Sequence, residues 1–302
     1  MPIEKRTIEQ KTIDKAAQVL LEKAEKEKIA TIWDRWEAMQ PFCKYGKQGI
    51  CCTFCNMGPC QIRRDGMTGV CGATAEVIVA RNLLRKIAAG CAAHSDHARS
   101  IAHTFLLTAE GKTQGYKITD ENKLRRLASE YGIDLANKTK EKIAEEVAKI
   151  ALLEFGKSEG ELRFLKRAPQ KQQETWHKLN IAPRAVDREI VEALHRTNMG
   201  VDNDYKSLIF HGLRTALADG WGGSMIATDI SDILFRSPRA IRAQVNLGIL
   251  KEKEVNIIVH GHEPLLAEVI VQVASDPELV KQAKEVGAEG INLAGICCTA
   301  NE

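Results

Sequence analysis

The six cysteines between positions 43 and 71 restrict the fold of this chain more than any other feature. The last four follow the spacing C-x2-C-x4-C-x10-C and are Cys52, Cys55, Cys60 and Cys71. Four thiolates are the ligand set of one [4Fe-4S] cluster. We expect Gly58 and Pro59 to turn the chain toward Cys60, because glycine tolerates positive φ and proline fixes φ. The spacing therefore predicts a loop that holds one cubane cluster.

Two further cysteines, Cys43 and Cys51, remain after this set is filled. Cys51 directly precedes Cys52, and neighbouring side chains tend to point apart, so we do not expect both to bind one cluster. Two thiolates are half of a four-thiolate set. A second copy of the chain across a two-fold axis would supply the other half. Ligand counting thus predicts a homodimer with an iron–sulfur cluster shared between its subunits.

Two other uses of clustered cysteines fit less well. A disulfide framework is disfavoured because the sequence begins without a secretory signal and nine cysteines are few for 302 residues. A structural zinc site is the stronger alternative. Zinc ribbons usually contain two short C-x2–4-C pairs, whereas this stretch contains one clean pair, Cys52 and Cys55.

Composition narrows the class of protein further. The length of 302 residues suggests two domains, and a net charge of +3 gives no reason to expect nucleic acid or an anionic membrane as a partner. No apolar run approaches the roughly 18 residues of a membrane span. Cysteines that look unpaired, with no export signal, predict a reducing cytoplasmic location.

Hydrophobic periodicity predicts a mixed fold that begins with a helical iron–sulfur domain over residues 1–240. The cysteine stretch reads as loop, and residues 219–225, rich in glycine, read as a bend. Apolar residues at threes and fours predict helices over about 7–39, 73–90, 92–109, 119–168, from 183 onward and 204–219.

The sequence pattern changes from helical to strand-like near residue 254. Residues 241–302 are therefore expected to form the beginning of a Rossmann-like α/β domain. Strands are expected at 255–260 and 290–294, with two helices between them that open at Pro264 and Pro277. The strands end near His260, His262, Cys297 and Cys298. Since sites in open α/β sheets gather beyond the carboxyl ends of strands, imidazole and thiolate at both ends suggest a metal site.

Five blocks of this sequence resemble the catalytic subunit of nickel–iron carbon monoxide dehydrogenases from anaerobes. They occur in the order of that family and extend over nearly the whole chain. The blocks are Gly49–Arg63, Ala92–His97, Gly220–Asp232, Val259–His262 and Gly295–Glu302.

The resemblance implies roles for individual residues. Cys43 and Cys51 would bind the cluster shared between subunits, and the four cysteines from Cys52 to Cys71 would bind a [4Fe-4S] cluster within the subunit. The first ligands of a [Ni-4Fe-4S] cluster would be His262 and Cys298, with Cys297 as their neighbour. An acid–base group and the histidine row behind it would be His94, His97 and His103.

The resemblance also implies an activity and partners. The reaction would be oxidation of carbon monoxide with water to carbon dioxide, two protons and two electrons. Electrons would pass through the [4Fe-4S] clusters to a ferredoxin-like carrier, and acetyl-CoA synthase is a candidate partner. Histidine suits proton transfer because its unperturbed pKa lies near 6.5.

The chain departs from that family in two respects. Catalytic subunits are much longer, and no cysteine follows Cys298, so the nickel cluster lacks part of its ligand set. We expect an N-terminal portion that is inactive alone, or a short paralogue. The histidine row has a gap at Ser100. Alternatives are a hybrid-cluster protein (a hydroxylamine reductase), whose N-terminal cysteine spacing differs, and a non-catalytic iron–sulfur electron-transfer dimer.

Overall fold

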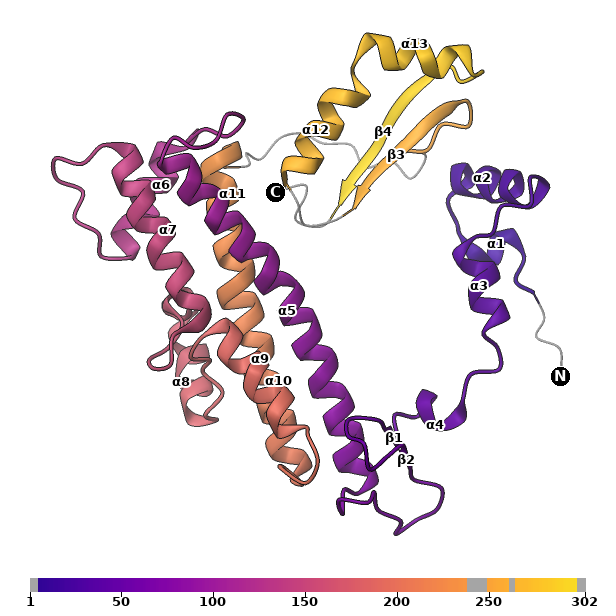
Figure 1. Cartoon of the computed structure of the whole chain (residues 1–302), viewed down its shortest axis with the longest axis vertical. Helices are drawn as coiled ribbons and strands as arrows, with labels where there is room; N and C mark the ends of the chain where they lie inside the picture. Colours follow the sequence, from indigo (N-terminus) through magenta and orange to yellow (C-terminus); the bar gives the residue numbers. More distant parts are fainter. Residues whose placement is uncertain (1–4, 238–248, 261–263, 298–302) are drawn as a thin grey trace. The chain divides into compact units, whose positions relative to one another are not determined.

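The structure is a computed structural model that describes residues 5–237, 249–260 and 264–297. It separates into two compact units, of which one comprises residues Lys44–Pro238 and the other residues Met1–Cys43 with Arg239–Glu302. The units are described in turn. Most of the chain is helical, with little sheet (Figure 1). The expected domain boundary at residues 240 and 241 lies outside the described residues and stays a prediction.

Residues 44–238 are organised along one long helix, α5 (Ala75–Ala109), which crosses the unit from end to end (Figure 1). Thr74 caps its start by accepting a hydrogen bond from the backbone N–H of Val77. The expectation of two helices separated near Gly90 is wrong. A glycine inside a helix costs about 1 kcal/mol relative to alanine, which the packing of the helix on both sides of Gly90 outweighs.

The other elements of this unit follow in chain order. These elements are α4 (Lys44–Lys47), β1 (Cys51–Cys52), β2 (Cys60–Gln61), α6 (Glu121–Glu130), α7 (Lys140–Gly156), η1 (Arg163–Arg167), α8 (Gln170–Lys178), α9 (Val186–Arg196), α10 (Tyr205–Ala218), η2 (Asp219–Ser224) and α11 (Met225–Phe235). Several of them, α7, α9, α10, η2 and α11, pack against α5.

Two hydrophobic cores lie along α5. One surrounds its second half and includes Phe105, Leu124 and Ile230. The other joins the cysteine loop to its first half and includes Cys52 and Ile78. Burying one such large apolar side chain contributes about 1.5–3 kcal/mol. Apolar packing therefore fixes the cysteine loop to α5, in addition to the chain connection that leads from the loop into the helix.

The glycine-rich stretch expected to form a bend is instead a π-helix, η2. It follows α10 directly and continues into α11, so the backbone stays helical throughout residues 205–235. π-helical turns are rare and are often found at functional sites. Here the wider turn absorbs three glycines without breaking the helix.

In the other unit, one helix was expected over residues 7–39, and this expectation is wrong. The structure contains α1 (Ile8–Lys11), α2 (Lys15–Lys26) and α3 (Ile32–Ala38). Asp14 accepts a hydrogen bond from the N–H of Ala16 at 2.9 Å and so starts α2. Thr31 and Asp34 form the capping box of α3. Short polar side chains favour caps over helix interiors, which explains the breaks.

The same unit contains the expected strand–helix–helix–strand order: β3 (Glu254–His260), α12 (Pro264–Ala274), α13 (Pro277–Glu285) and β4 (Gly290–Cys297). The strands pair in parallel, with one irregularity between Ile257 and Ile258. Asp276 caps α13, and Pro277 occupies its first position. Two paired strands agree with an α/β arrangement, and the Rossmann-like assignment stays a prediction. Within the described residues, no helix combines the length and apolar character needed to cross a membrane.

Candidate iron–sulfur loop and histidine–carboxylate pair

The predicted cluster ligands Cys52 and Cys60 lie opposite each other in a short antiparallel pair. Cys52 is in β1 and Cys60 is in β2, and the two are direct cross-strand partners. The turn that joins the strands carries Cys55, which is half-buried. The structure therefore brings three of the four predicted ligands into one small hairpin.

The turn of this hairpin contains Gly58, where a side chain would be too close to the backbone. A Cβ at this position would lie 3.0 Å from the Cys60 nitrogen and 3.1 Å from the Cys52 carbonyl oxygen. Gly58 does not adopt positive φ, so the expected reason for glycine was wrong although the turn itself is present. Close approach of the turn to β1 is what excludes a side chain here.

Two of the predicted ligand sulfurs accept hydrogen bonds. The backbone N–H of Val70 donates to Cys60 Sγ at 3.5 Å, and Arg81 Nη1 donates to Cys71 Sγ at 3.6 Å. Burial acts to raise the pKa of the Cys71 thiol, but hydrogen bonds from Arg81 and from the backbone at Ala73 and Gly200 outweigh it, and the net effect lowers that pKa. The thiolate, which is the metal-binding form of cysteine, is thereby favoured.

The donor set fits an iron–sulfur cluster. Cys51, Cys52, Cys55, Cys60 and Cys71 are all free thiols. N–H donors directed at ligand sulfurs are among the features that set the potential of such clusters. Within residues 5–237, 249–260 and 264–297, no three His, Cys, Asp or Glu side chains are grouped to hold one metal ion.

Cys43 and Cys51 belong to different units. Cys43 is exposed and is the last residue of the N-terminal segment of its unit, whereas Cys51 begins β1. Asn82 of α5 donates hydrogen bonds to the carbonyls of Gly49 and Cys51, at 2.8 Å and 3.1 Å. The backbone at Cys51 is thus anchored to α5. The shared cluster stays a prediction.

The three histidines of the predicted row all lie on α5 but in different surroundings. His94 is half-buried, His97 is buried and His103 is exposed. His103 follows His94 by nine residues. At about 100° per residue this rotates the side-chain direction by about 180°, so the two histidines lie on opposite faces of α5. The helix alone therefore does not align them, and a relay role for His97 and His103 stays a prediction.

His94 has a carboxylate partner that sequence reasoning missed. Its Nδ1 lies 2.8 Å from Asp219 Oδ1, and the Ser224 hydroxyl donates to the same oxygen at 3.4 Å. Asp219 and Ser224 are the first and last residues of η2. The signal that could have found Asp219 is its position at the head of the glycine-rich block, one residue before Gly220.

Two glycines allow η2 to approach α5 closely enough for this contact. A Cβ at Gly223 would lie 3.4 Å from the backbone carbonyl of His94. A Cβ at Gly222 would lie 2.6 Å from Val186 Cγ2 and 3.0 Å from Leu162 Cδ1. The glycine pair thus fits η2 between α5 and the buried side chains beyond it, and this fixes the distance between His94 and Asp219.

The second predicted constellation is described only in part. His262 and Cys298 lie outside the described residues, and the side chains of His260 and Cys297 are not described. The backbones of His260 and Cys297 are direct partners in the parallel pair of β3 and β4. The two strand ends therefore lie side by side, while the ligand roles of His262, Cys297 and Cys298 stay predictions.

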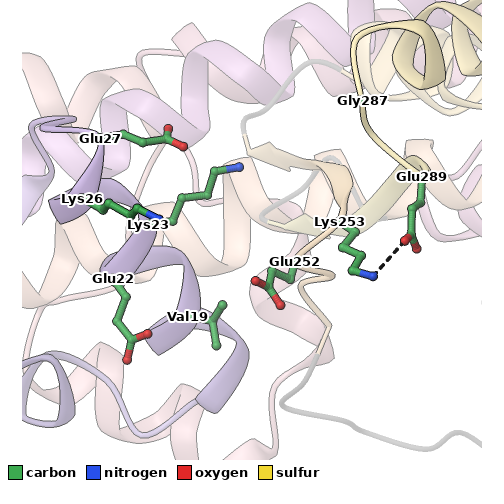
Figure 2. Close-up of a pocket in the computed structure, with 9 residues that line it drawn as sticks. All are labelled: Val19, Glu22, Lys23, Lys26, Glu27, Glu252, Lys253, Gly287 and Glu289. Carbon is green, nitrogen blue, oxygen red and sulfur yellow. Dashed lines mark ion pairs between the residues drawn. The ribbon is translucent and has the colours of Figure 1, made fainter.

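The unit that contains β3 and β4 also has an open pocket of about 670 Å³ (Figure 2). Its lining combines four glutamates with three lysines, and Lys253 pairs with Glu289 at 3.1 Å. The described residues that line it include no predicted cysteine or histidine ligand. The mixed charge offers no preference for an anion or a cation, so we do not assign it a role.

Comparisons with known proteins connect these features to one family. A family model described as the Prismane/CO dehydrogenase family matches residues 50–302. Carbon monoxide dehydrogenase 1 of Methanosarcina acetivorans is 57% identical over 301 residues, which are 99% of this chain and 48% of that protein. The carbon monoxide dehydrogenase/acetyl-CoA synthase subunit beta of Moorella thermoacetica is 43% identical over 298 residues, 97% of this chain and 44% of that protein.

A solved structure agrees with the sequence matches. The as-isolated, nickel-free crystal structure of carbon monoxide dehydrogenase from Thermococcus sp. AM4 matches with a TM-score of 0.88 at 49% identity, covering 100% of this chain and 48% of that chain. The chain belongs to the Prismane/CO dehydrogenase family, and the resemblance to carbon monoxide dehydrogenases is confirmed. It spans about half the length of the curated relatives that it matches.

Proposed function

We propose that this chain is part of an anaerobic nickel–iron carbon monoxide dehydrogenase. The reaction is oxidation of carbon monoxide with water to carbon dioxide, two protons and two electrons. The observation that carries the proposal is the dual use of α5. Its first half packs on the cysteine loop through Cys52, and its second half carries His94 beside Asp219. Electron transfer and proton transfer are thus served by one rigid helix.

The cysteines provide the electron path in this proposal. The ligands of a [4Fe-4S] cluster within the subunit are Cys52, Cys55, Cys60 and Cys71. Cys43 and Cys51 together supply half of the ligands of a cluster shared with a second copy of the chain. Bound clusters supply one-electron transfer, and the protein adds hydrogen bonds and burial that tune it. The [Ni-4Fe-4S] cluster would be held in part by His262 and Cys298, with Cys297 beside it.

His94 is the acid–base group in this proposal. If Nδ1 carries its proton toward Asp219, Nε2 is left as the nitrogen that accepts a proton from the reaction. The carboxylate also fixes the direction of the ring, because the hydrogen bond at 2.8 Å is short and charge-assisted. The contact of Gly223 with the α5 backbone keeps the two groups together.

The proposed partners follow from the family. Electrons leave to a ferredoxin-like carrier, and a homodimer completes the shared cluster. Acetyl-CoA synthase is a further candidate partner, supported by the 43% identity to a subunit of a carbon monoxide dehydrogenase/acetyl-CoA synthase. The proposed location is the cytoplasm, because thiols that bind clusters need a reducing compartment.

The direct test is carbon monoxide-dependent reduction of a viologen dye by protein purified anaerobically from its own cells, with nickel and iron measured on the same sample. The proposal expects nickel in the preparation and dye reduction that depends on carbon monoxide. It expects His94→Ala to lower the rate strongly at unchanged metal content. Iron–sulfur clusters with no nickel and no response to carbon monoxide would contradict the enzyme and support the electron-transfer dimer instead.

A further inference from the structure

Arg81 is a buried cation with an unusual set of partners. It lies on α5, ten residues after Cys71, and is 1% exposed. Its Nη1 donates to Cys71 Sγ at 3.6 Å, and its Nη2 donates to the Asp202 carbonyl at 2.8 Å and to Asn203 Oδ1 at 2.7 Å. Two of these acceptors are neutral oxygens, and the third is a predicted cluster ligand.

A buried guanidinium normally needs a negative partner, because an unpaired charge inside a protein is costly. Several other arginines of this unit pair with carboxylates: Arg99 with Asp187, Arg184 and Arg214 with Glu189, and Arg196 with Asp202. Arg85, which is only half-buried, donates instead to the Thr197 hydroxyl and the Leu194 carbonyl. Within the described residues, Arg81 makes no ion pair with a carboxylate, and its buried Nε has no hydrogen-bond partner. The negative charge that would balance Arg81 is therefore the thiolate of Cys71 and whatever that thiolate binds.

Asn203 bridges Arg81 and Cys71 through two hydrogen bonds. Its side-chain oxygen accepts from Arg81, and its side-chain nitrogen donates to the Cys71 carbonyl at 3.3 Å. Arg196 binds the Asp202 carboxylate through Nε at 3.1 Å, which fixes the loop that carries Asn203. The position of the guanidinium is thus set from three directions, by α5, by the cysteine loop and by the loop before α10.

We propose that Arg81 sets the reduction potential of the [4Fe-4S] cluster bound by Cys52, Cys55, Cys60 and Cys71, and that Asn203 positions it. This inference rests on the proposed ligand set. Reduction adds one electron, and hence one negative charge, to the cluster. A fixed positive charge and an N–H donor at a ligand sulfur stabilise the reduced form more than the oxidised form, so they raise the potential. The effect is large because the guanidinium is buried, where charges are screened little.

The test is an anaerobic redox titration of the full chain after reconstitution with iron and sulfide, followed by electron paramagnetic resonance. Every sample also carries Cys43→Ser and Cys51→Ser, so that one cluster is expected per chain. Arg81→Met should titrate at a more negative potential than the parent, and Arg81→Lys should shift less. Asn203→Ala should shift in the same direction, because the guanidinium loses one of its two oxygen acceptors.

Arg64→Met is the matched control. Arg64 is exposed on the same loop and its removal changes the net charge equally, but solvent screens its field, so the potential should stay near that of the parent. If Arg81→Met does not retain four irons, Arg81→Lys and Asn203→Ala carry the test. The role of Arg81 would be overturned if Arg81→Met and the parent titrated at the same potential with the same iron content. It would also be overturned if Arg64→Met shifted the potential as much as Arg81→Met. A parent without four irons would overturn the ligand set itself.

Discussion

His94 and Asp219 are 125 positions apart in the sequence, and yet His94 Nδ1 lies 2.8 Å from Asp219 Oδ1. His94 is on the long helix α5, whereas Asp219 begins the π-helix η2. The side chains of His94 and Asp219 are 39% and 26% exposed, so the pair is accessible to a reacting group while its geometry is fixed. A histidine oriented in this way is suited to accept and release protons.

Removal of Asp219 should impair proton transfer without removing metal. In Asp219→Ala the ring of His94 loses the partner that fixes its tautomer and direction. Under the proposed function, carbon monoxide oxidation by the complete enzyme should then fall about 10- to 100-fold. Viologen reduction and metal content would be measured together. Asp96→Asn, an exposed change two residues from His94 on the same helix, should leave the rate unchanged. Full activity in Asp219→Ala would remove the role of this pair.

The fit of η2 can be tested with two glycines of one motif. In Gly222→Ala the new Cβ would meet Val186 Cγ2 at 2.6 Å, so we expect the free energy of unfolding to fall by about 1–3 kcal/mol. Gly220→Ala is the control, because nothing lies within 4 Å of its Cβ position. It should be neutral or slightly stabilising, since alanine favours helix over glycine. Equal losses in both variants, measured by denaturant unfolding, would contradict this packing.

The sequence predicted the turn between Cys55 and Cys60 but not the extent of the neighbouring helices. The turn follows from local residue types, and the structure pairs Cys52 with Cys60 on either side of it, while the ligand roles of the cysteines stay predictions. The continuity of α5 through Gly90 depends on packing along its whole length, and no local pattern reveals it. Asp14 and Thr31 did carry cap signals, which the apolar periodicity of residues 7–39 concealed.

The contacts between distant segments also could not be predicted from the sequence alone. His94 with Asp219, and Arg81 with Cys71 and Asn203, each depend on how helices cross. Arg81 had no signal apart from its position on the helix that follows Cys71. By contrast, the adjacent ends of β3 and β4 followed from the rule for parallel strands, and the pairing of His260 with Cys297 agrees with it.

A buried carboxylate between α9 and α10 gives the fold a dependence on pH. Glu189 is fully buried, and Arg184 Nε donates to its Oε1 at 3.0 Å while Arg214 Nε donates to its Oε2 at 2.6 Å. Burial acts to raise the pKa of Glu189, but the imidazole of His211, whose Nε2 lies 3.3 Å from Oε2, outweighs it together with hydrogen bonds from Arg184 and the charge of Arg214, and the net effect lowers the pKa.

A lowered pKa in the folded state means that Glu189 contributes stability above its unfolded pKa of about 4.3. That contribution should be lost as the pH falls from about 4 through the lower folded value. Glu189→Gln should cost about 1–3 kcal/mol near neutral pH, because half-buried Arg184 and Arg214 would lose one carboxylate and keep only Glu192, and it should weaken the dependence on acid. Exposed Glu121→Gln is the control. Unfolding curves at several pH values that coincide for Glu189→Gln and the parent would refute this.

The shared cluster predicts a link between iron content and assembly. Replacing Cys43 and Cys51 together by serine should remove one cluster per dimer and loosen the dimer, because each subunit would lose its half of the site. Iron per chain and molar mass by light scattering would be measured under anaerobic conditions. A monomer that still binds iron through these two cysteines would contradict the shared site.

The most direct test of the account is iron per chain in Cys60→Ser compared with Cys91→Ala. Cys60 is a predicted ligand whose sulfur accepts the Val70 N–H, whereas Cys91 is a buried free thiol elsewhere on α5. The account predicts that Cys60→Ser loses or alters one four-iron cluster, with a changed electron paramagnetic resonance spectrum, and that Cys91→Ala keeps its iron and its spectrum. Unchanged iron and an unchanged spectrum in Cys60→Ser would contradict it.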